Sequence, residues 1–169
     1  MSSYPVELVI FNDIATTLKA AMPSIRDVTW WNNQLSNQSE ENPIALPAVY
    51  VAIDIDWSAE AAGRQRGDAT VTLHVVGESF ENAYHQSVDY AGATENVNRV
   101  NDTYKAIQGL TGDNYTALER RRTVLDNNAD HMIDHQLQFT CVITDDQLDF
   151  NNTYQKITPD LLSGRATIE

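Results

Sequence analysis

The residues most suited to chemistry are two aspartate–histidine pairs, Asp130-His131 and Asp134-His135. On a helix, the spacing of four would bring both histidines to one face, as in the zinc-binding helix of a metalloprotease. That motif needs a glutamate after the first histidine, where this sequence has Met132, and the segment opens a strand pattern. We therefore expect a surface turn that leads into a strand, without metal ligands.

The other candidate groups have ordinary structural roles in this reading. His74 lies on the polar face of a strand pattern and should find a partner within the sheet. Cys141 lies within a run of strand formers and should be a buried thiol, not a nucleophile. The sequence has no nucleophile elbow, phosphate-binding loop, dinucleotide fingerprint or C-x-x-C pair. It predicts no catalytic residue, no metal and no cofactor.

Arg120, Arg121 and Arg122 form the only run of basic residues. In a regular strand Arg120 and Arg122 would point one way and Arg121 the other. The charges could protect an edge strand from stray pairing, or they could pair with an acidic neighbouring subunit. Two further arginines, Arg64 and Arg66, lie in a linker that is also a candidate for contacts with neighbours.

Large aromatic residues lie near the ends of several segments. Trp30 and Trp31 are adjacent, so a strand would direct them to opposite sides, where one can enter the core and the other needs a second cover. Aromatic residues at segment ends are common in protein interfaces. We take Trp31, Trp57 and Phe150 as candidate interface residues.

Hydrophobic periodicity predicts two helices and five strands. Ile10, Ile14 and Leu18 are spaced four apart, and Pro23 ends the first helix. Gly109 followed by Leu110 is typical of a Schellman helix end. The expected helices span 6–22 and 93–108, and the expected strands span 28–31, 48–57, 69–78, 117–125 and 135–144.

The remaining segments are polar. We expect a long loop over 32–46 and a mobile hairpin tip over 58–68. We expect a short helix or an ordered loop over 80–91. The element order predicts an α+β fold, with a mainly antiparallel sheet of about four to five strands and two principal helices on one face. We expect one domain over 1–144 and a C-terminal arm over 145–169.

The composition argues against proteins that bind nucleic acid tightly and against proteins that span a membrane. The chain has 169 residues and one cysteine. Its formal charge of −13 argues against tight binding of nucleic acid, whose phosphates are also negative. No run of about twenty apolar residues and no secretory signal is visible. We expect a protein that is made and used in a cytoplasm and does not contact membranes.

The pattern resembles the tail terminator, or tail completion, proteins of long-tailed phages, including the lambda-type terminator. The resemblance covers roughly residues 6–144 and rests on the order of the helices and strands and on the local sequence pattern within them. The segments that carry it are the first helix, the strand Pro47-Ala48-Val49-Tyr50-Val51, the strand Thr72-Leu73-His74-Val75-Val76-Gly77, the helix end Ala106-Ile107-Gln108-Gly109-Leu110 and the strand His135-Gln136-Leu137-Gln138-Phe139. The loop 32–46 and the arm 145–169 depart from a minimal member.

The resemblance implies a homohexameric ring at the head-proximal end of a virion tail. Such a ring would end the tail tube and join it to the head connector, while DNA passes through without specific binding. The negative charge fits that passage. Three alternatives stay open: another neck or stopper subunit, a bacterial α+β module that binds a ligand or a protein, and a metal-dependent hydrolase built on His131 and His135.

Overall fold

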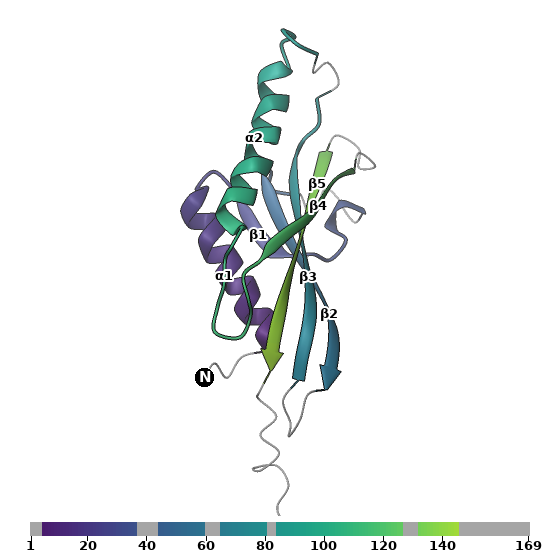
Figure 1. Cartoon of the computed structure of the whole chain (residues 1–169). Helices are drawn as coiled ribbons and strands as arrows, with labels where there is room; N and C mark the ends of the chain where they lie inside the picture. Colours follow the sequence, from purple (N-terminus) through teal and green to yellow (C-terminus); the bar gives the residue numbers. More distant parts are fainter. Residues whose placement is uncertain (1–4, 37–43, 60–64, 81–83, 127–131, 146–169) are drawn as a thin grey trace, which may run out of the picture.

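The computed structural model describes residues 5–36, 44–59, 65–80, 84–126 and 132–145 (Figure 1). The order of helices and strands agrees with the sequence prediction. The elements are helices α1 (Val6–Ala21) and α2 (Tyr90–Ile107), a short 3-10 turn (Gln34–Ser36), and strands β1 (Asp27–Trp30), β2 (Ala48–Ala59), β3 (Gln65–Glu78), β4 (Glu119–Asp126) and β5 (Met132–Asp145). Neither helix is long and apolar enough to cross a bilayer.

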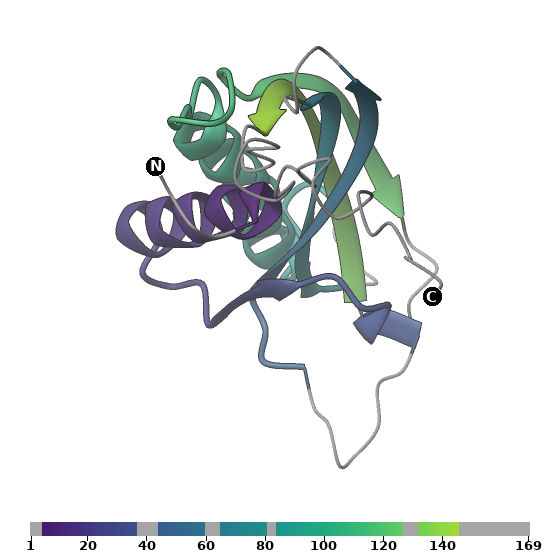
Figure 2. The same cartoon turned by 90° about the horizontal axis from the view of Figure 1, so that it is seen from below.

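The five strands form one sheet in the order β1-β2-β3-β5-β4. Strand β1 runs parallel to β2, and the other neighbours are antiparallel. Both helices pack on the same side of the sheet (Figure 2). We call this side the helix face and the opposite side the helix-free face. The predicted α+β class and the predicted placement of the helices are confirmed.

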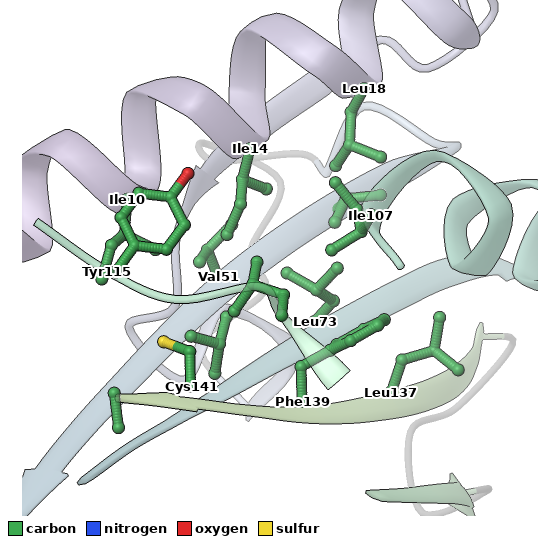
Figure 3. Packing of buried hydrophobic residues seen from close by; sticks show 14 of the residues in the cluster. Ile10, Ile14, Leu18, Val51, Leu73, Ile107, Tyr115, Leu137, Phe139 and Cys141 are labelled. Atoms are coloured by element: carbon green, nitrogen blue, oxygen red, sulfur yellow. The ribbon is translucent and has the colours of Figure 1, made fainter. Parts of the chain in front are cut away.

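The main core lies between the helices and the helix face (Figure 3). Ile10, Ile14 and Leu18 are fully buried because their spacing aligns them on one side of α1. Leu73 and Phe139 meet them from β3 and β5, where every second side chain points to the helices. Burial of each such side chain contributes roughly 1.5–3 kcal/mol, which makes this layer the principal source of stability.

The β2–β3 hairpin is longer than its hydrophobic pattern indicates. The expected linker 58–68 is partly strand, because Ser58 pairs with Arg66 and Ala59 with Gln65. Backbone hydrogen bonds continue beyond the last buried side chains, since pairing requires no apolar residue. The strands therefore extend towards a tip at 60–64, which lies outside the described residues.

Helix α2 begins and ends differently from the prediction. It starts at Tyr90, three residues before the expected start at 93, and the Thr94 hydroxyl donates to the Tyr90 carbonyl at 2.7 Å from inside the helix. At the other end Gly109 has a φ of 83°, but the Leu110 amide bonds the Ile107 carbonyl at 3.0 Å. This is a type II turn, in which glycine takes the third position, and not the predicted Schellman end.

Candidate functional site

The arginine run lies on the edge strand β4, but its side chains do not alternate as predicted. The register shifts between Arg120 and Arg122, which marks a β-bulge. A bulge places an extra residue in one strand and changes which way the following side chains point. Arg120 therefore lies on the helix face, while Arg121 and Arg122 both lie on the helix-free face. The expectation that Arg120 and Arg122 share a side is wrong for this reason.

The three arginines differ in their contacts. The Arg120 guanidinium lies 3.6 Å from the centre of the Tyr104 ring. Arg121 donates to the Thr140 hydroxyl at 2.9 Å and lies 3.1 Å from a carboxylate oxygen of Glu119. The Arg122 side chain is exposed and makes no hydrogen bond or ion pair with the residues described. Its charge is the one most available to a partner.

Acidic side chains gather at the other end of the helix-free face. Asp54 and Asp56 on β2 and Asp68 on β3 are all exposed. Asp56 stands directly opposite Asp68 in the register, and like charges in that position repel. Thus one end of this face is acidic and the other carries Arg121 and Arg122.

A depression of about 540 Å³ lies between the two charged ends. Asp56 and Asp68 line it on one side, and Glu119 and Arg121 on the other. Because its floor is a polar sheet surface, it suits contact with a protein surface better than enclosure of an apolar ligand.

The other predicted interface residues lie in several places. Arg66 is exposed on the helix-free face. Trp57 is 40% exposed and packs on the helix face over Gly67, where an added Cβ would come within 3.1 Å of its ring. Arg64 and Phe150 lie outside the described residues, as does nearly all of the predicted arm. Their interface roles stay predictions.

Trp31 is half-buried and caps a polar pair on the helix-free face. Its ring stacks on His74 with centroids 3.9 Å apart and planes within 5°. Trp30 points the other way and stacks on Phe11 of α1 at 4.4 Å. The two tryptophans thus take opposite sides of the sheet, as predicted, and the second cover of Trp31 belongs to its own chain.

Beneath Trp31, the His74 Nδ1–H donates to Asp134 Oδ2 at 2.7 Å, and both side chains are buried. Gln136 donates to the same oxygen at 3.1 Å. The other oxygen, Asp134 Oδ1, is buried and has no hydrogen-bond partner among the described residues. The prediction that His74 has a partner within the sheet is confirmed.

This arrangement separates two of the residues in the hypothetical metal motif. Strand β5 directs Asp134 to the helix-free face and His135 to the helix face, because neighbouring strand residues alternate. Burial lowers the pKa of His135, although Asp134 partly opposes this shift. Asp130 and His131 lie outside the described residues. Among the residues that the structure describes, no group of three His, Cys, Asp or Glu side chains could hold a metal ion.

Cys141 is a core thiol, as predicted. It is 6% exposed and packs in the helix-face cluster. Burial raises its pKa to about 11, so the thiolate needed for nucleophilic attack is scarce at neutral pH.

A second apolar cluster was missed in the sequence. Trp31, Leu35, Ile44 and Leu46 pack over a small buried group on the helix-free face that consists of Ala48, Tyr50, Val76 and Met132. The loop 32–46 looked uniformly polar, but its ends carry these apolar residues. Their scattered spacing gave no period that could have identified them.

Comparisons with known proteins show a likeness of fold to solved structures. No family model matches the chain, and no curated protein matches it. A solved structure described as the virion of a native gene transfer agent particle contains a chain with a similar fold. The TM-score is 0.58 at 14% identity, over 85% of this chain and 100% of that chain. At this identity the likeness concerns the fold.

Proposed function

We propose that the chain is a structural protein of a phage-like virion, and that it serves as a tail terminator. The observation that carries this proposal is the fold shared over the whole length of a chain from a gene transfer agent virion. The resemblance of the sequence pattern to tail terminators supports the same role. In that role the protein forms a ring, most simply a hexamer, that ends the tail tube and joins it to the head connector.

The surface supports this proposal. A subunit of a closed ring must present two different, complementary patches. On the helix-free face, Asp54, Asp56 and Asp68 gather at one end, and Arg121 and Arg122 lie at the other end beside Glu119. The net charge of −13 would repel the phosphates of DNA that passes through the ring. The protein therefore has no catalytic role in this proposal, and its partners are its own copies, the tube protein and the connector.

Polymerisation of the matching tail tube protein tests this function. With the chain present, electron microscopy should show tubes with extra density at one end, and elongation from that end should stop. Tubes that keep growing and bind none of the chain would contradict the proposal. Binding to an isolated head connector, without binding to tubes, would instead indicate a neck or stopper subunit.

A further inference from the structure

Besides the outer edge of the short strand β1, two longer strand edges pair with no strand of the described chain. Strand β1 covers β2 only along Ala48–Val51, so the outer edge of β2 from Ala52 onwards pairs with no described strand. The outer edge of β4 likewise pairs with no strand of the described chain, although its Arg120 amide donates to the Gln108 side chain at 3.0 Å. Open edges offer backbone groups to another chain. We call the first the β2 edge (Ala52–Ala59) and the second the β4 edge (Glu119–Asp126).

On the helix-free face the β2 edge is acidic, whereas the β4 edge carries two arginines together with Glu119 and Asp126. On the β2 edge, Asp54 and Asp56 are exposed on the helix-free face, and neither makes an ion pair with the residues described. On the β4 edge, Arg121 and Arg122 lie on the same face. If the two edges met in one continuous sheet, these aspartates and arginines would lie side by side. Opposite charges on neighbouring strands stabilise their pairing.

Each of these edges also carries one exposed apolar side chain on the helix face. Trp57 on the β2 edge is 40% exposed, and Leu125 on the β4 edge is 51% exposed. They are two of the six large exposed apolar side chains in the described residues. A shared sheet would bring them to the same side of the contact, where each would lose exposure to water.

We infer that the β2 edge of one copy binds the β4 edge of the next copy in a head-to-tail contact. This inference rests on the proposed ring. Charge disfavours symmetric pairing of two β2 edges, because aspartate would oppose aspartate, whereas Asp54 and Asp56 can pair with Arg122 of a β4 edge. A contact between different patches at opposite ends of the sheet generates a ring when its rotation closes.

The competing explanation is that the charges only prevent stray edge pairing, as they do in many monomeric sheet proteins. The two explanations predict opposite effects of charge reversal. If the edges bind each other, reversal of the charge on one edge should break the head-to-tail contact. If the charges only prevent stray pairing, the reversed charge should prevent it equally well, and the association state should not change. Reversal on both edges should then restore the contact, because the charges become complementary again.

The experiment compares Asp54→Arg and Arg122→Glu by light scattering after size exclusion, or by the amount bound per tail-tube end. Each variant alone should associate at least about tenfold more weakly than wild type. An equimolar mixture should recover the association, because the reversed edge of each variant then meets a complementary edge of the other. A single chain with both substitutions should recover it as well.

Matched controls are Asp102→Arg and Lys105→Glu, which change the net charge equally at an exposed ion pair on α2. They should assemble as wild type, and circular dichroism should confirm that all variants fold. Wild-type assembly of both edge variants, or failure of the mixture to recover, would overturn this contact while leaving the ring intact. A wild-type chain that is monomeric both alone and with tubes would overturn the ring itself.

Discussion

Trp31 lies flat on His74, with ring centroids 3.9 Å apart, and thereby seals the bond between His74 and Asp134 from water. No α-helix of the described chain covers the helix-free face, and Trp31, directly after β1, provides this cover. Aromatic stacking adds about 0.5–1.5 kcal/mol to the burial of the rings. The stacked pair therefore fixes the end of β1 against β3.

Replacement of Trp31 by alanine should destabilise the fold strongly. The change removes the stack and opens the buried His74–Asp134 pair to solvent, so the free energy of unfolding should fall by about 2–4 kcal/mol. Urea denaturation followed by circular dichroism measures the loss. The control is Trp57→Ala, whose side chain is more exposed and which should cost less than half as much. Equal losses for the two variants would show that Trp31 is not a structural cap.

The Asp134 carboxylate should matter as the acceptor for His74. Asp134→Ala leaves a buried N–H without its partner and should cost about 2–4 kcal/mol. Asp134→Asn keeps an oxygen that can accept the bond, so its loss should be clearly smaller. Thermal and urea unfolding of both variants test this ordering. Indistinguishable stabilities would mean that the hydrogen bond contributes little.

Stability should fall in mild acid because of His135. Burial lowers its pKa in the folded chain, whereas an unfolded histidine titrates near about pH 6.5. Between the lowered pKa and pH 6.5 the unfolded state binds more protons, so the free energy of unfolding decreases as the pH falls through this window. His135→Gln should flatten this part of the pH profile, and the exposed His85→Gln should not. Identical profiles for both variants would refute this origin.

The Cys141 thiol should be unreactive in the folded protein. It is buried and its pKa is raised to about 11, so both access and thiolate content are low. Labelling with a thiol reagent at pH 8 should be at least about a hundredfold slower in buffer than in urea. Rapid stoichiometric labelling of the native chain would contradict the placement of this residue in the core.

The sequence was most informative where burial imposes a period. The stripe of Ile10, Ile14 and Leu18 identified α1 to within one residue of its end. The alternation through Leu73 and Phe139 identified β3 and β5 and the sides that they bury. These patterns are strong because each buried side chain must point towards the same core.

Other features depend on partners that are distant in the chain and leave no local period. The Asp134–His74 contact joins residues 60 positions apart. The bulge that turns Arg121 and Arg122 to one face arises from pairing with β5, and isolated strand periodicity cannot reveal it. The extension of the β2–β3 hairpin beyond Trp57 was missed because backbone pairing continues among exposed polar residues.

The mass of the chain in solution tests the proposed ring most directly, and light scattering after size exclusion measures it over a range of concentrations. The ring predicts one discrete species at high concentration. Six subunits of 18.9 kDa give about 113 kDa, and electron microscopy of that species should show closed rings. An 18.9 kDa monomer at every concentration, with none bound at the ends of added tail tubes, would contradict the account.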